Sequence, residues 1–245
     1  MKVVLIAHAR SGSNSLVEVL QLHPAIARIE NEPFNERYVT WAPDHQDFVA
    51  RLRSGESFED VLAEVFANAD GLKVLSYQLD DDALASLTHR SDVRVLTLRR
   101  RNLLQTAISQ TVAMATDLWQ AWNASKPLED YYTDIGALDM ASIRTFMDWT
   151  RIEIERTQRL TADIDALHLR YEDLYTGTMD ARVETVAAIW SFLNLASVDS
   201  PDIRRFLSPV MQQARTSTYG KISNLDEIEA ELGSDEWGHV AIGVE

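Results

Sequence analysis

Short hydrophobic runs alternate along the chain with stretches in which hydrophobic residues recur every three or four positions. The first run, at 3–7, leads into a polar turn and then into hydrophobic residues at helical spacing from about 13 to 22. Short runs of this kind predict buried strands, and the periodic stretches predict amphipathic helices. The same pattern predicts strands at 72–79, 93–98 and 167–171, a candidate strand at 26–29, and helices that begin near residues 58, 84, 102, 139 and 183.

This alternation predicts an α/β fold with a central, mainly parallel sheet and helices on both faces. The 245 residues fit one domain, 1–245, and no repeat or low-complexity linker divides them. The carboxyl ends of parallel strands meet at one edge of the sheet, where such folds bind their ligands. We therefore expect the polar residues that follow the predicted strands to form one site.

The turn after the first strand is rich in hydrogen-bond donors: Arg10, Ser11, Ser13, Asn14 and Ser15. A tight turn that opens a helix directs backbone N–H groups and the positive end of the helix dipole at one point. The sequence therefore predicts an anion site here. Gly12 is not followed by the lysine of the usual triphosphate-binding loop, and no glycine precedes it at the interval that this loop requires.

Arginines at 99–101 follow the strand at 93–98, at the place where a nucleotidase would carry an aspartate for Mg²⁺. The residues thus favour an anion bound without metal, although Asp80, after the strand at 72–79, argues otherwise. The formal net charge of −15 opposes binding to nucleic acid or to anionic membranes. The chain has no cysteine, and its first hydrophobic run is too short for a signal peptide. No stretch approaches a membrane span, so we expect a cytoplasmic protein.

The motifs together resemble those of the PAPS-dependent sulfotransferases, enzymes that use 3′-phosphoadenosine 5′-phosphosulfate. The segment 10–15 looks like their phosphosulfate loop, and Arg101 with Ser109, eight positions on, resembles their 3′-phosphate motif. The bacterial and carbohydrate-type branch is the most similar, on Leu22-His23-Pro24, Glu32-Pro33-Phe34, Gly71-Leu72-Lys73 and Arg170-Tyr171-Glu172-Asp173-Leu174. The resemblance spans roughly residues 3 to 193 and implies a P-loop-like sheet.

The resemblance implies roles for individual residues. Arg10 and the loop residues Ser11, Gly12, Ser13, Asn14 and Ser15 would bind the 5′-phosphosulfate, and Arg101 and Ser109 would bind the 3′-phosphate. Glu32 is expected to be the base that takes the proton of the acceptor hydroxyl. Lys73 would approach the group that is transferred, and the reaction would need no metal. His8 stays open as an alternative base.

Several features depart from the cytosolic steroid and phenol enzymes of this family. Those enzymes have lysine where Arg10 stands, use a histidine base and carry a glycine-rich signature near the C-terminus, to which 215–217 corresponds only loosely. The acceptor is expected to be a carbohydrate or a small metabolite, and the segment 111–150 is expected to shape its groove. This segment contains Trp119, Trp122 and Trp149, which are expected to be mostly core, with part of the set lining the groove. The sequence leaves open whether the protein forms a homo-oligomer. The alternative functions are a P-loop kinase or nucleotidase and a non-catalytic nucleotide-binding module.

Overall fold

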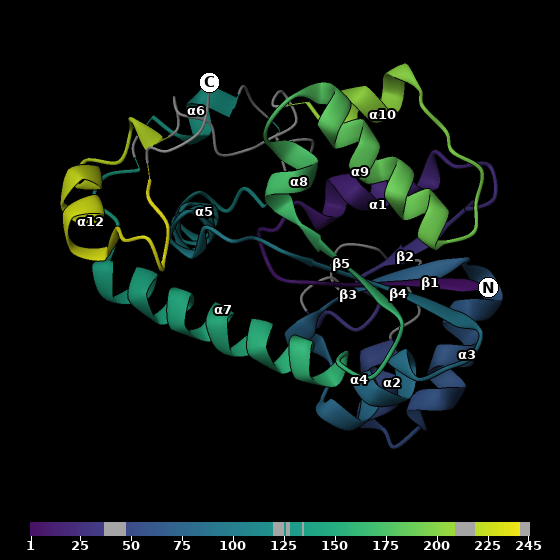
Figure 1. The fold of residues 1–245 in the computed structure, drawn as a ribbon. Coiled ribbons are helices and arrows are strands. Elements are labelled where there is room, and N and C mark those ends of the chain that lie inside the picture. Colours follow the sequence, from purple (N-terminus) through teal and green to yellow (C-terminus); the bar gives the residue numbers. More distant parts are fainter. Residues whose placement is uncertain (37–47, 120–124, 126–127, 134, 209–218, 241–245) are drawn as a thin grey trace.

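The structure, a computed structural model, describes residues 1–36, 48–119, 125, 128–133, 135–208 and 219–240. Five parallel strands form one sheet in the order β2-β3-β1-β4-β5 (Figure 1). Their bounds are β1 (Lys2–Ala7), β2 (Ile29–Asn31), β3 (Gly71–Leu75), β4 (Val93–Arg99) and β5 (Ala166–Arg170). The chain runs from β1 to the β2–β3 side of the sheet and then crosses to β4, so its direction reverses beside β1. A reversal of this kind opens a crevice at the carboxyl ends of the strands.

Helices cover both faces of the sheet and extend beyond its carboxyl edge (Figure 1). One face carries α1 (Ser13–Gln21), α8 (Tyr171–Tyr175), α9 (Met179–Phe192) and α10 (Pro201–Phe206), and the other carries α2 (Phe48–Arg53), α3 (Phe58–Asn68) and α4 (Asp81–Thr88). Beyond the carboxyl edge lie α5 (Leu103–Thr116), α6 (Leu128–Tyr131) and α12 (Leu225–Leu232), and α7 (Met140–Leu160) runs from this end of the molecule to α4. No helix within the described ranges combines the length and hydrophobicity that crossing a membrane requires.

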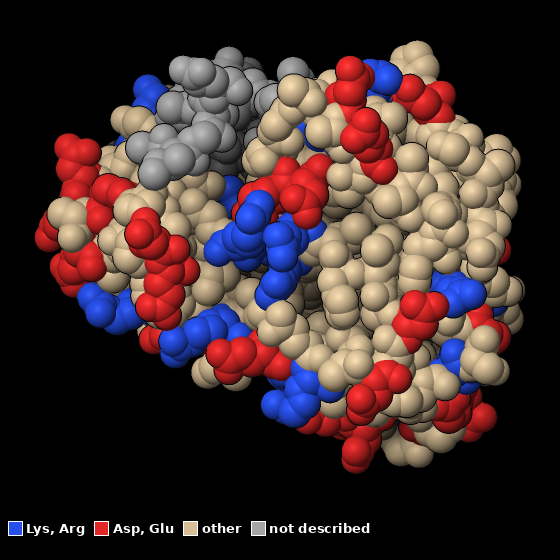
Figure 2. All heavy atoms as spheres, viewed as in Figure 1, with Lys and Arg blue, Asp and Glu red and all other residues tan. Residues whose placement is uncertain are grey.

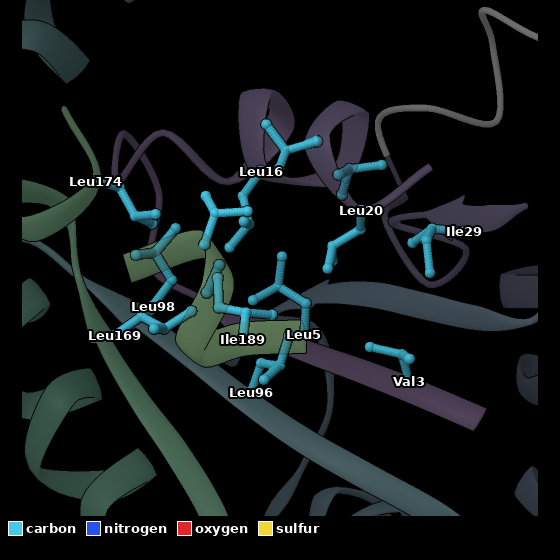
Figure 3. Close-up of a cluster of buried hydrophobic side chains, with 14 of the residues drawn as sticks. Val3, Leu5, Leu16, Leu20, Ile29, Leu96, Leu98, Leu169, Leu174 and Ile189 are labelled. Carbon is cyan, nitrogen blue, oxygen red and sulfur yellow. The ribbon is translucent and has the colours of Figure 1, made fainter. Parts of the chain in front are cut away.

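Alternate residues of the strands fill two separate cores, which is what a sheet covered on both faces demands. Val3 and Leu5 point to the core under α1 and α9, where they meet Leu16 and Ile189 (Figure 3). Val4 and Ile6 point the other way, into the core formed with α3 and α4. The predicted fold class, a parallel sheet between two helical layers, is confirmed.

Two predicted strand boundaries are wrong because local contacts override the hydrophobic pattern. The second strand is β2 at 29–31 rather than 26–29. The third begins at Gly71 and stops at Leu75 instead of running from residue 72 to residue 79. A Cβ at residue 71 would lie 2.2 Å from the carbonyl oxygen of Val3, so only glycine lets β3 approach β1 there. The side chain of Gln78 accepts a hydrogen bond from the N–H of Leu75 (2.9 Å), and the chain turns into the short 3₁₀ helix η2 (Ser76–Gln78).

Other differences are smaller. Tyr171, expected to end the last strand, begins α8, and α2 was not predicted at all. Asp80 caps α4 by accepting a hydrogen bond from the N–H of Ala83 (2.8 Å), which gives this carboxylate a structural role. Trp122 and the segment 215–217 lie outside the described residues.

Candidate functional site

The loop between β1 and α1 is held in shape by a tyrosine from a distant helix. Gly12, the N-cap of α1, has a left-handed backbone with φ 79°. Tyr175 of α8 donates a hydrogen bond from its hydroxyl to the carbonyl oxygen of Gly12 (2.8 Å). A Cβ at residue 12 would lie 2.6 Å from the Tyr175 ring. Both the conformation and the adjacent ring therefore require glycine.

The N-terminus of α1 differs from those of most longer helices in the described part of the chain. Side chains cap α3, α4, α5 and α7, whereas α1 has no side-chain cap and no acidic residue in its first turn. Its first N–H groups have no partner within the helix. Ser11 does not cap it either, because its hydroxyl donates back to the carbonyl oxygen of His8 (2.7 Å). The start of α1 thus suits an anion that comes from outside the chain.

Arg10 joins the first predicted motif to the second. Its Nε donates to the hydroxyl of Ser109 on α5 (3.0 Å), and its Nη1 donates to the carbonyl oxygen of Trp119 (2.8 Å). Ser109 is buried. The guanidinium group is thereby directed across the mouth of the β1–α1 loop toward α5, although 99 residues separate Arg10 from Ser109 in sequence.

A buried ion pair lies beside this loop at the ends of β2 and β3. Lys73 is 1% exposed and Glu32 is 5% exposed. The Lys73 ammonium donates to Glu32 Oε1 and to Asn14 Oδ1, the latter at 2.8 Å. Burial lowers the pKa of Lys73, while Glu32 acts in the opposite direction. Because β3 lies between β2 and β1, Lys73 is the group that connects Glu32 with the loop residue Asn14.

The other oxygen of Glu32 is also engaged. Its Oε2 accepts hydrogen bonds from Asn35 Nδ2 (2.5 Å) and from Gln78 Nε2 (2.9 Å). The backbone of Glu32 is left-handed, with φ 56°. A non-glycine residue in this conformation costs on the order of 1–3 kcal/mol and is typical of functional sites. Arg10, with φ 62°, is another of the four such residues in the described part of the chain. Two of these four are therefore residues that the sequence assigned to the site.

His8 is buried below the loop, next to Ser76, whose hydroxyl lies 3.3 Å from its Nδ1. Burial, assisted by the nearby Arg99 charge, lowers the pKa of His8 to about 4. The imidazole is therefore neutral at pH 7. A group with so low a pKa is a weak proton acceptor, which disfavours His8 as the base.

Arg101 pairs with carboxylates of α8, and no hydrogen bond among the described residues joins it to Ser109. Its side chain is 58% exposed and forms ion pairs with Glu172 (3.7 Å) and Asp173 (4.0 Å) at the start of α8. Glu172 also accepts hydrogen bonds from the backbone N–H groups of Arg101 (2.9 Å) and Asn102 (3.3 Å). Figure 2 shows basic side chains gathered on this face between the positions of α5 and α8, with acidic side chains at their border.

Arg100, which directly follows β4, is a second arginine in this region. The Arg100 guanidinium lies over the Tyr171 ring, 4.2 Å from its centre, and donates to Gln105 Oε1 (2.5 Å). Tyr171 in turn packs on Tyr175, the residue that holds Gly12. The sequence offered no periodicity or motif for these tyrosine contacts, because they depend on how α8 docks against the loop.

Residues near the C-terminus form hydrogen bonds with the first residues of α5, a contact that the sequence did not predict. Asn102 caps α5 through its Oδ1, and its Nδ2 donates to the carbonyl oxygen of His239 (2.8 Å). The N–H of Leu104 donates to the carbonyl oxygen of Trp237 (3.0 Å). An anion near Arg101 must therefore be bound mainly by side chains, because these amide groups at the start of α5 are already occupied.

The structure thus brings the predicted residues together in two groups and leaves one apart. Arg10 and Ser109 form the first group, and Lys73, Glu32 and Asn14 form the second. Arg101, between β4 and α5, lies apart from both groups and pairs with Glu172 and Asp173 of α8. Ser13 is buried and Ser15 half-buried in the first turn of α1. Among the described residues, no three His, Asp or Glu side chains gather in a group able to hold a metal ion.

The fold is similar to that of solved sulfotransferases. A sulfotransferase from Alicyclobacillus acidocaldarius shares it with a TM-score of 0.51 at 14% identity, over 94% of each chain. Sulfotransferase STF9 from Mycobacterium avium (TM-score 0.46, 13% identity, 84% of this chain and 66% of that one) was also found. So was retinol dehydratase in complex with retinol and PAP (TM-score 0.45, 16% identity, 96% of this chain and 72% of that one). No family model and no curated protein matches the sequence. The chain therefore has a sulfotransferase-type α/β fold.

Proposed function

We propose that the protein transfers the sulfuryl group of PAPS to a hydroxyl group of an acceptor. The observation that carries this proposal is the hydrogen bond from Arg10 to Ser109, which unites the loop motif and the second motif at the carboxyl edge of the sheet. The two motifs were identified separately from the sequence, and this bond brings one residue of each motif together beside the loop. The sulfotransferase-type fold supports the same reading.

The residues at the loop fit the phosphosulfate group of this substrate. The uncapped start of α1 offers N–H groups to an anion, and Arg10 lies directly beside it. Arg101 is the exposed cation available for the 3′-phosphate, after exchange of its carboxylate partners Glu172 and Asp173 for phosphate oxygens. Ser109 then acts chiefly through Arg10.

The reaction is an in-line displacement at sulfur. A bond forms between the acceptor oxygen and sulfur, the bond from sulfur to the phosphate oxygen breaks, and the hydroxyl proton passes to a base. Catalysis of such a transfer depends on positioning and on stabilising charge on the departing phosphate. Arg10 and Lys73 supply that positive charge. Glu32 is the proposed base, since it is the carboxylate held next to the loop and its backbone is strained into place.

Calorimetry with PAP, the desulfated product, tests the nucleotide assignment. We expect PAP to bind equally well with Mg²⁺ and with a chelator, and far more tightly than ATP. Binding that needs Mg²⁺, or that favours ATP, would instead support a P-loop kinase or nucleotidase. Arg10→Ala should weaken PAP binding, while Arg94→Ala, at the opposite end of β4 and paired with Asp165, serves as the matched control. PAP binding without transfer to any hydroxyl compound would identify a non-catalytic module.

A further inference from the structure

The segment 234–240 packs on the start of α5 as a small folded unit. Ser234 and Gly238 exchange two backbone hydrogen bonds (3.1 and 2.7 Å), and the hydroxyl of Ser234 accepts a third from the N–H of Trp237 (3.1 Å). Its contact with α5 is close, since a Cβ added at Gly238 would lie 2.5 Å from the side chain of Asn102. The segment therefore has a defined shape and a fixed position on α5.

Gln105 in the first turn of α5 joins this segment to Arg100. Gln105 is buried, and its Nε2 donates to the carbonyl oxygens of His239 (3.1 Å) and Val240 (3.0 Å). Its Oε1 accepts a hydrogen bond from Arg100 Nη2 (2.5 Å). Both ends of one amide group are thus engaged, so the position of the Arg100 guanidinium depends on where the segment 234–240 lies.

Arg100 is held by uncharged groups. Most arginines in the described part of the chain pair with a carboxylate, whereas Arg100 forms no ion pair there, although the net charge is −15. The nearby carboxylate of Glu172 accepts hydrogen bonds from the backbone N–H groups of Arg101 and Asn102 instead. The guanidinium plane lies 4.2 Å from the centre of the Tyr171 ring, a stacking contact that fixes the ring on one side.

The contacts continue from Tyr171 to the β1–α1 loop. Tyr171 packs on Tyr175, with ring centres 4.9 Å apart. The hydroxyl of Tyr175 donates to the carbonyl oxygen of Gly12, which also accepts the N–H of Leu16 in the first turn of α1 (3.2 Å). The β1–α1 loop thus lies at one end of an unbroken series of contacts, and the segment 234–240 lies at the other.

We infer that Arg100 and Gln105 are positioning residues for nucleotide binding, which connect the segment 234–240 to the β1–α1 loop through Tyr171 and Tyr175. The inference rests on the proposed function. It gives Arg100 no contact with the nucleotide, in contrast to the arginines assigned to its phosphates. Loss of either positioning residue should leave the loop less firmly held and weaken PAP binding, although no ligand of PAP is removed.

Double-mutant cycles on PAP affinity, measured by calorimetry, test this route. Arg100→Ala and Gln105→Met should each weaken PAP binding by about fivefold, the effect of one hydrogen bond, and so should Tyr175→Phe, which removes the hydroxyl that holds Gly12. Arg100→Ala/Tyr175→Phe and Gln105→Met/Tyr175→Phe should bind PAP no more weakly than Tyr175→Phe alone, because both members of each pair act through the same contact. Arg94→Ala, at the other end of β4, is the control.

A conservative variant separates positioning from direct binding. Arg100→Lys keeps the positive charge but lacks the planar group that stacks on Tyr171, so it should bind PAP as weakly as Arg100→Ala. Native affinity in Arg100→Lys, or losses that add in Arg100→Ala/Tyr175→Phe, would show that Arg100 binds the nucleotide itself and would overturn its positioning role.

The remaining outcomes separate this inference from the proposed function. Variants of Arg100 and Gln105 that lose unfolding free energy in urea but bind PAP like the native protein would show that these contacts serve stability alone, and the inference would fail. A native protein that does not bind PAP would overturn the proposed function itself.

Discussion

Variants of the buried ion pair between Glu32 and Lys73 can distinguish its contribution to protein stability from its contribution to catalysis. Glu32→Gln removes the negative charge, so the Lys73 ammonium, 1% exposed, keeps only uncharged amide oxygens as partners among the contacts described above. Breaking a buried ion pair on one side costs about 3–5 kcal/mol. For a chain of this size the melting temperature should fall by roughly 6–20 °C. Lys73→Met should cost a similar amount, because it leaves the Glu32 carboxylate buried without its cation.

The double variant Glu32→Gln/Lys73→Met should be much more stable than the sum of the single variants predicts. Removing both charges leaves no unpaired ion, and such replacements are often nearly neutral. Urea unfolding of the four proteins gives the coupling free energy, which we expect to be at least about 3 kcal/mol in favour of the native pair. Additive losses would show that the two side chains do not act as a buried pair.

The same double variant then tests catalysis in a folded protein. If Glu32 is the base, sulfuryl transfer should fall by about 10²–10⁴-fold, the range for general base catalysis. PAP affinity should fall far less, since the loop amides and Arg10 are unchanged. A stable double variant that transfers at the native rate would show that the pair has a structural role alone.

Three further predictions concern the nucleotide site and the histidine below it. Arg101→Ala should weaken PAP binding by about 2–4 kcal/mol and adenosine 5′-phosphosulfate, which lacks the 3′-phosphate, far less; calorimetry showing equal losses would remove Arg101 from that role. His8 has a pKa of about 4 in the folded protein, below its ordinary 6.5, so the unfolded chain binds the extra proton between these values. Stability should therefore fall by up to about 3 kcal/mol as the pH drops from 6.5 to 4, and urea unfolding of His8→Gln should lack this contribution. Gly12→Ala should cost about 1–3 kcal/mol in unfolding free energy and reduce PAP affinity, because its Cβ meets Tyr175; unchanged affinity would contradict the account of the loop.

The fold was predictable because its signals are local. Each buried strand is a short apolar run between polar turns, and α3 and α5 begin at Phe58 and Leu103, close to the predicted starts near 58 and 102. The carboxyl edge of the sheet followed from the order of strands and helices alone. The end of β3 was predicted wrongly because the hydrogen bond between Gln78 and Leu75 depends on a side chain that no hydrophobic pattern reports.

The candidate site was predictable by residue type and less so by arrangement. The sequence singled out Arg10, Ser109, Glu32 and Lys73, and the resemblance assigned Ser109 and Arg101 to the 3′-phosphate, which stays a prediction. The structure adds a hydrogen bond from Arg10 to Ser109, a contact between a loop and a helix that no spacing along the chain encodes.

The hydrogen bond from Tyr175 to Gly12 has a consequence for how the protein matures. It joins residues 163 positions apart, so the loop acquires its final shape only after β5 and α8 have docked. A chain still being synthesised holds residues 1–15 from the outset, yet it lacks the hydroxyl that fixes the turn. On the proposed function, nucleotide affinity should therefore depend on α8, and a chain truncated before residue 171 should bind PAP weakly.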